Sequence, residues 1–175
     1  MVDNDLVSLA LEILGYDKIL SMIDCIIDEI KEKIVNQVLD EYFSSNFNKI
    51  SDMLSSINSN STEFSDINNY KDLVRKAMID LVKYLSEDDL GIEVIYKDLN
   101  TYIVEVFYYK LGYFKNKDDA ERLAEMIKDL KIKINEYIRS NNQISVLMKL
   151  RDKLKSKLDM LQMDLKNKLI NQISE

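Results

Sequence analysis

The chain has 175 residues, a formal net charge of −7, and neither histidine nor proline. Without histidine it lacks the commonest general base and zinc ligand, which excludes serine–histidine and cysteine–histidine catalysis. Cys25 is the single cysteine, so an intrachain disulfide and a cysteine-cluster metal site are both excluded. We therefore expect a protein that is not an enzyme, with no catalytic residues, no cofactor and no bound metal.

Proline and glycine interrupt helices, and the chain has no proline and only three glycines, at positions 15, 91 and 112. This composition predicts an all-α fold, a helical bundle of about five to six helices. We expect an acidic helical body over residues 1–112, with a loop rich in serine and asparagine at 58–69. A coiled-coil-like antiparallel helical hairpin is predicted to follow over residues 113–175.

Charge is unevenly distributed along the chain. Residues 1–105 hold nine basic and 21 acidic side chains, a balance of −12. Residues 106–175 hold 15 basic and ten acidic side chains, a balance of +5. This asymmetry favours either head-to-tail contact between copies or an acidic body that presents a basic arm to an acidic partner.

A first helix is predicted over residues 3–14, where apolar side chains on almost every side indicate burial. Gly15 would end this helix, because glycine is favoured just beyond a helix C-terminus. A second helix would begin at Asp17 and bury the face formed by Ile19, Ile23, Ile26, Ile30, Ile34, Val38 and Tyr42. Within this apolar run we expect Cys25 to be a buried, unreactive thiol.

Serine and asparagine dominate residues 44–69, yet apolar residues keep helical spacing as far as Ile57. This pattern predicts a helix that is weakened at residues 44–46, followed by an exposed loop at 58–69. Another helix is predicted over residues 70–85, with Leu73, Ala77, Leu81 and Leu85 directed inward. Residues 86–89 have the composition of a capping box for the next element.

Residues 91–109 fit two structures, because polar side chains four apart are in phase with both a helix and a strand. Helix is favoured, since a lone hairpin is marginal and no third strand is apparent. The alternative is a small β-hairpin at 92–109, which its β-branched and aromatic residues suit. In that hairpin, Ile92, Val94 and Tyr96 would pair across a turn at 98–100 with Tyr102, Val104, Val106 and Tyr108.

The C-terminal hairpin is predicted from two apolar stripes separated by a polar turn at 140–142. Asn116 or Asp118 would cap the first helix, whose stripe comprises Ala120, Leu123, Ile127, Leu130, Ile134 and Tyr137. The second stripe occupies heptad positions at Ile144, Leu147, Leu154, Leu158, Leu161 and Leu165, with Arg151 in the same series. Two helices joined by so short a turn are expected to lie antiparallel.

A two-helix hairpin leaves part of its apolar stripe uncovered and needs a third surface, from its own chain or from another. Either the hairpin belongs to the core of a bundle, or it is an exposed arm that binds a partner. We favour a non-enzymatic interaction or scaffold protein that self-associates, as a homo-oligomer, or docks on a partner protein. The expected contacts are Leu147, Leu154, Leu158, Leu161 and Leu165.

An alternative function is that of a nucleic-acid-associated subunit of a larger complex. It would use the basic side chains of Lys149, Arg151, Lys153 and Lys157. A sequence pI near 4.8 disfavours it, because an acidic protein repels phosphate except at a local patch. No stretch approaches the roughly 18 apolar residues of a membrane span, and the acidic start does not fit a signal peptide, so we expect no membrane contact and a cytoplasmic location.

Overall fold

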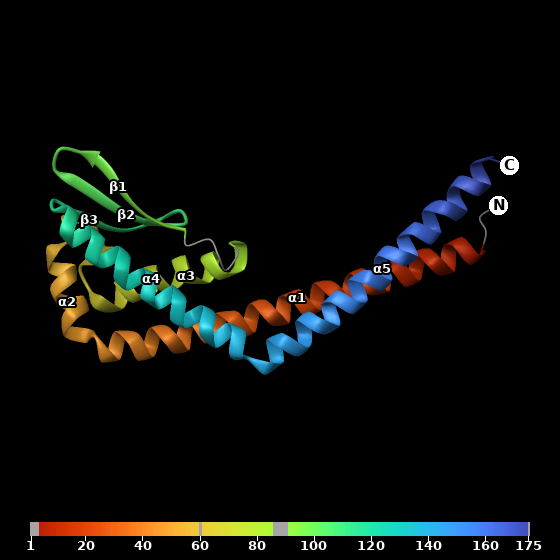
Figure 1. Cartoon of the computed structure of the whole chain (residues 1–175), viewed down its shortest axis with the longest axis horizontal. Coiled ribbons are helices and arrows are strands. Elements are labelled where there is room, and N and C mark those ends of the chain that lie inside the picture. Colours follow the sequence, from red (N-terminus) through yellow and green to blue (C-terminus); the bar gives the residue numbers. More distant parts are fainter. Residues whose placement is uncertain (1–3, 60, 86–90, 175) are drawn as a thin grey trace. The chain divides into compact units, whose positions relative to one another are not determined.

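The computed structural model describes residues 4–59, 61–85 and 91–174. Over these residues the chain is mostly helical, with five α-helices, one 3₁₀ turn and a three-stranded antiparallel sheet (Figure 1). The predicted predominance of helix is confirmed, and the small β-hairpin that the prediction allowed at 92–109 belongs to a three-stranded sheet. No helix in these ranges is long and apolar enough to cross a membrane.

Helix α1 spans Asn4–Ser45 without interruption, so the predicted end at Gly15 is wrong. A glycine inside a helix costs only about 1 kcal/mol relative to alanine. One buried stripe continues on both sides of Gly15, and its packing outweighs this cost. The stripe comprises Leu6, Leu9, Ile13, Ile23 and Ile27.

The other apolar side chains in the first half of α1 are more exposed than predicted. Val7, Leu11 and Leu14 are exposed, which corrects the expectation of burial on every side. The same correction applies to Ile19 and Ile26, and the predicted buried thiol of Cys25 is exposed as well. Apolar spacing can indicate which faces of a helix are suited to burial, but burial also needs a neighbour on that face.

The chain forms two compact units. The first contains α1 up to Ile30 and the residues from Ser140 onward, and the second contains residues 31–139. Helix α4 (Lys117–Ser140) therefore lies almost wholly in the second unit, and α5 (Asn142–Ser174) lies in the first. The predicted division at residue 112 and the predicted antiparallel pairing of α4 with α5 stay predictions.

In the second unit, the weak point predicted near residue 45 is confirmed. Helix α1 ends at Ser45, and α2 spans Phe47–Ser56. Both the backbone N–H and the side-chain amide of Asn46 donate to the carbonyl of Tyr42, each at 3.0 Å. The amide side chain of Asn46 thus competes for a helical carbonyl, which is why asparagine favours helix ends.

The polar loop is shorter than predicted. It contains the 3₁₀ turn η1 (Thr62–Phe64), whose Phe64 is buried, and α3 begins at Ile67 and ends at Tyr84. Asp66 caps α3 by accepting a hydrogen bond from the N–H of Asn68 at 3.0 Å. Most of the predicted inward face of α3 is buried, whereas Leu85 follows the helix and is only half-buried. The predicted capping box at 86–89 lies outside the described residues.

Residues 92–114 form the sheet, so the helix favoured for residues 91–109 is wrong and the hairpin alternative is right. Strands β1 (Ile92–Asp98), β2 (Thr101–Val106) and β3 (Tyr109–Phe114) are antiparallel neighbours in that order. The predicted pairing of Ile92, Val94 and Tyr96 across the turn is confirmed, because they lie opposite Val106, Val104 and Tyr102. Strand β3 was not predicted, and Tyr108 lies in the turn before it rather than in the hairpin.

Helix α4 begins as predicted. The N–H of Asp118 donates to Oδ1 of Asn116 at 2.8 Å, so Asn116 provides the cap. Its predicted apolar stripe is buried from Ala120 to Ile134, whereas Tyr137 is exposed. One turn of the stripe therefore extends beyond the apolar core of the second unit.

Candidate functional site

The helix pair of the first unit, formed by α1 up to Ile30 and by α5, is antiparallel (Figure 1). Leu158 of α5 is only 6% exposed and packs with Leu9 and Ile13 of α1. Further along the pair, the Arg151 guanidinium Nε lies 2.7 Å from the carboxylate Oδ1 of Asp24. As the position on α5 falls from 158 to 151, the position on α1 rises from 9–13 to 24, which defines the antiparallel orientation.

The five leucines predicted to contact a partner all lie on one face of α5. Leu158 is buried in the contact with α1, and Leu161 and Leu165 pack around the same cluster. Leu147 and Leu154 are half-buried. The structure thus covers at least three of the predicted contact residues with α1 of the same chain.

A second apolar stripe of α1 was missed by sequence reasoning and is uncovered in the chain. Val7, Leu11 and Leu14 are 45%, 63% and 62% exposed. The same side of the helix continues to Lys18, four residues after Leu14, and to the exposed Cys25, seven residues or about two turns further on. We call these five residues the outer stripe.

The outer stripe lies on the side of α1 that faces away from α5. Leu11 follows the buried Leu9 by two residues and precedes the buried Ile13 by two, and two residues correspond to about 200° around a helix. A helix with apolar stripes on two opposite sides needs a neighbour on each of them. The 3–4 spacing of Val7, Leu11 and Leu14 is the signal in the sequence, but apolar residues on almost every side of residues 3–14 predict one wholly buried helix.

The two helices of the pair carry opposite charge. Residues 4–30 of α1 contain six acidic side chains and one lysine, a balance of −5. Helix α5 contains seven basic and three acidic side chains, a balance of +4. The Asp24–Arg151 ion pair is half-exposed, and such pairs contribute about 0–1 kcal/mol each. The opposite charges of α1 and α5 therefore determine which helices associate, and they add little to the stability of the pair.

Three of the four residues predicted to contact nucleic acid follow one another at intervals of four on α5, which places them on one side of the helix. Arg151 is engaged by Asp24, whereas Lys149, Lys153 and Lys157 are exposed on α5. These three lysines lie on the helix that packs against the acidic α1 of the same unit. The contact of these four residues with nucleic acid stays a prediction.

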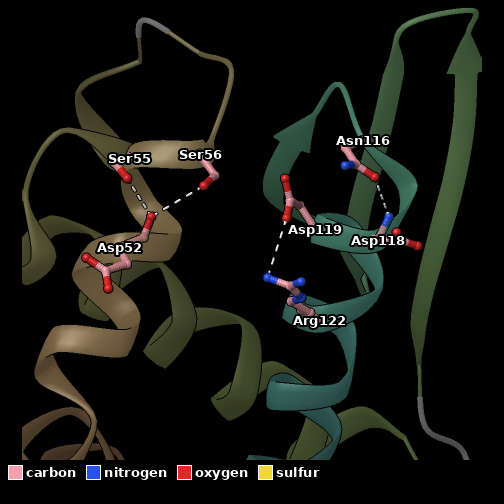
Figure 2. Close-up of polar contacts among 7 residues, drawn as sticks. All are labelled: Asp52, Ser55, Ser56, Asn116, Asp118, Asp119 and Arg122. Carbon is pink, nitrogen blue, oxygen red and sulfur yellow. Dashed lines mark hydrogen bonds and ion pairs between the residues drawn. The ribbon is translucent and has the colours of Figure 1, made fainter.

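The second unit contains a cleft of about 970 Å³ between α2 and α4, where Val94 of β1 also contributes to the lining. Some polar groups in and beside this cleft pair within their own helix (Figure 2). The hydroxyls of Ser55 and Ser56 donate to the main-chain carbonyl of Asp52 at 2.5 and 3.4 Å. Arg122 pairs with Asp119 at 3.9 Å. Six acidic and three basic side chains line the cleft in all.

The residues that line this cleft include neither histidine nor cysteine. The part of the chain that the structure describes holds no cluster of three or more acidic or thiol side chains with metal-binding geometry. The sequence has no histidine, which is the usual general base beside a serine or cysteine nucleophile. The outer stripe of α1 is therefore the stronger candidate site, as an interaction surface. No protein-family model matches this chain, and neither a curated protein nor a solved structure matches it.

Proposed function

We propose that this is a non-enzymatic interaction protein that self-associates through its helix pair, with the outer stripe of α1 covered by α5 of a second copy. The exposure of Val7, Leu11 and Leu14, on the side of α1 opposite to its contact with α5, is the observation that carries the proposal. The leucines predicted as contacts keep a role in it. Three of them, Leu158, Leu161 and Leu165, pack in the cluster of Leu9 and Ile13 and hold α1 with its outer stripe facing away from α5.

The apolar area is sufficient for a weak contact. Full burial of a leucine or valine side chain contributes roughly 1.5–3 kcal/mol, and about half of each of these three side chains is exposed. The outer stripe alone would thus contribute on the order of 2–4 kcal/mol before the cost of association is subtracted. Apolar side chains of α5 that face solvent, among them Met160 and Met163, would add to this contact.

Charge favours α5 of a second copy as the occupant. A contact between two α1 helices would bring two segments of charge −5 together, with Lys18 in each outer stripe. A contact between α1 and α5 of a second copy would bring together charges of −5 and +4. Complementary charge lowers the cost of the second arrangement and raises its rate of formation. A nucleic acid is the weaker candidate partner, because Arg151 is already paired.

Cys25 allows a direct test, because it lies in the outer stripe and is the single cysteine. We expect thiol alkylation of Cys25 to slow as the protein concentration rises, since a second copy covers the stripe. The variant Leu11→Gln, Leu14→Gln should react at one rate at every concentration. Ile19→Gln, Ile26→Gln is the matched control, because both isoleucines are exposed on α1 about a quarter-turn from the outer stripe. An alkylation rate in the unmodified protein that does not change with concentration would contradict the proposal.

A further inference from the structure

Strand β1 forms one edge of the sheet in the second unit, because the strand order is β1-β2-β3. The opposite edge is partly closed, since the N–H of Asn58 donates to the carbonyl of Tyr113 in β3 at 2.7 Å. Within residues 4–59, 61–85 and 91–174, no other strand pairs with the outer side of β1. An unpaired edge of seven residues is a template for another strand.

The orientation of the backbone groups on this edge follows from one hydrogen bond. The N–H of Phe107 donates to the carbonyl of Gly91 at 2.8 Å, so Gly91 faces β2. In an antiparallel ladder, successive residues direct their N–H and C=O groups to opposite sides. The odd-numbered residues at the start of β1 therefore bond toward β2. The groups that point outward belong to Ile92, Val94 and Tyr96.

Glu93 of β1 lacks a cation beside it. Its neighbour across β2 is Glu105, and Glu105 in turn lies opposite Lys110 of β3. Like charges directly opposite each other destabilise a sheet. Glu93 takes part in no ion pair with any residue that the structure describes. A cation on the outer side of Glu93 would complete a row of lysine, glutamate, glutamate and cation.

We propose that β1 pairs antiparallel with β1 of a second copy, with Ile95 opposite Ile95 of the partner subunit. Val94 then lies opposite Tyr96 of the partner subunit, and both direct their backbone groups into the new ladder. Glu93 lies opposite Lys97 of the partner subunit, and the two-fold axis repeats this pair on the other side. The contact joins two three-stranded sheets and is independent of the contact proposed for the helix pair.

Only this register places Glu93 of each copy opposite Lys97 of the partner subunit. Successive residues direct their backbone groups to opposite sides of the strand. Any other register that keeps the outward backbone groups facing each other must therefore differ from this one by two residues. The nearest such register places Val94 opposite its own copy, and Glu93 then lies opposite Ile95 of the partner subunit. That arrangement leaves Glu93 and Lys97 without partners. Charge complementarity therefore points to a second copy of this chain rather than to an unrelated extended peptide.

The end of β1 limits the contact. The register with β2 shifts between Tyr96 and Asp98, which marks a β-bulge, and a bulge bends the edge of a sheet. Pairing is thus confined to about the five residues from Glu93 to Lys97. So short a ladder buries little surface and forms a weak, reversible contact.

A charge-swap series on the full chain tests this contact. We expect Glu93→Lys alone and Lys97→Glu alone each to weaken self-association about tenfold or more, because each places two like-charge pairs in the ladder. The double variant Glu93→Lys, Lys97→Glu should restore it, since both pairs become lysine opposite glutamate again. Within one strand the two side chains lie about 13 Å apart, so an intrachain pair does not explain the rescue.

All these variants are made in the Leu11→Gln, Leu14→Gln background, so that association through the helix pair does not contribute. Sedimentation equilibrium gives the association constant of each. Glu93→Lys also removes the repulsion from Glu105 within the chain, so this variant should be at least as stable to heat as its background. Weaker association without a loss of thermal stability therefore supports the proposal. Single variants that associate as well as their background, or a double variant no better than the single ones, would overturn it. Failure of the helix-pair proposal would instead show as an unaltered association constant in the Leu11→Gln, Leu14→Gln background itself.

Discussion

The hydroxyl of Tyr70 donates a hydrogen bond to the main-chain carbonyl of Leu111 at 2.8 Å, across 41 positions of sequence. Both residues are fully buried. The register between β2 and β3 shifts at Leu111, which has no partner across the strand pair because Gly112 lies opposite Val104 and Lys110 lies opposite Glu105. The side chain of α3 thus bonds to the sheet at its irregular position.

Tyr70→Phe should lower the free energy of unfolding by about 1–3 kcal/mol, because it leaves a buried carbonyl without this donor. Urea denaturation measures the change, and Tyr84→Phe is the control because Tyr84 is exposed at the end of the same helix. An equal, small effect of both substitutions would contradict the assigned role of the hydroxyl.

Stability should fall above pH 10. Burial raises the pKa of Tyr70 from the ordinary value of 10.0, and burial together with the charge of Asp129 raises that of Tyr42. A hydrogen bond to Asp80 raises the pKa of Tyr109. The folded state therefore keeps protons that the unfolded chain has lost above pH 10, so the stability from these groups is full below pH 10 and declines above it.

The absorbance of tyrosinate at 295 nm measures this behaviour directly. Tyr42, Tyr70 and Tyr109 should form tyrosinate at higher pH in the folded protein than in denaturant, which gives a late phase in the titration. Tyr109→Phe should remove part of the late phase without unfolding the protein, since its side chain lies near the surface. Identical titration curves for the folded and the denatured chain would contradict the assignment.

The sequence predicts α4 well because its apolar residues form one stripe that meets one core. It does not decide the structure of residues 92–106, since Glu93, Lys97, Thr101 and Glu105 fit a helix and a strand equally. Strand β3 was missed because it depends on contacts remote in sequence. Tyr70 bonds to it, and Gly112 allows Phe114 and Leu123 to pack closely over it.

The outer stripe shows a second limit of sequence reasoning. The residues of the predicted first helix are apolar on several sides, which is typical of a buried helix. In the chain, however, this part of α1 has one neighbouring helix in its unit, and that helix covers the face of Leu9 and Ile13. Periodicity identified the contact leucines of α5 as one face, but it did not identify α1 as the helix that covers them.

Two glycine substitutions should have opposite effects. At Gly15 a Cβ atom meets nothing within 4 Å, so Gly15→Ala should stabilise α1 by about 0.4–1 kcal/mol. At Gly112 a Cβ atom would lie 2.6 Å from the Phe114 ring and 2.8 Å from the Leu123 side chain, so Gly112→Ala should destabilise the protein. Thermal denaturation of both variants measures the effects. Destabilisation by Gly15→Ala would show that α1 is broken at this position.

Glu93→Lys should stabilise the isolated chain slightly. It replaces the opposed pair Glu93–Glu105 with lysine opposite glutamate, a change of roughly 0.5–1 kcal/mol. Urea denaturation at low protein concentration isolates this effect from association. Lys110→Glu should act in the opposite direction, because it places a third acidic side chain beside the same pair. A loss of stability in Glu93→Lys would contradict the strand register on which the β1 contact depends.

The central claim, that the outer stripe of α1 is covered by a second copy, is tested most directly by the molar mass in solution. Sedimentation equilibrium over a range of concentrations should give a mass above the 20.5 kDa of one chain. Leu11→Gln, Leu14→Gln should lower the average mass while Ile19→Gln, Ile26→Gln leaves it unchanged. A mass of 20.5 kDa at every concentration for the unmodified chain, or an equal response to both pairs of substitutions, would contradict the claim.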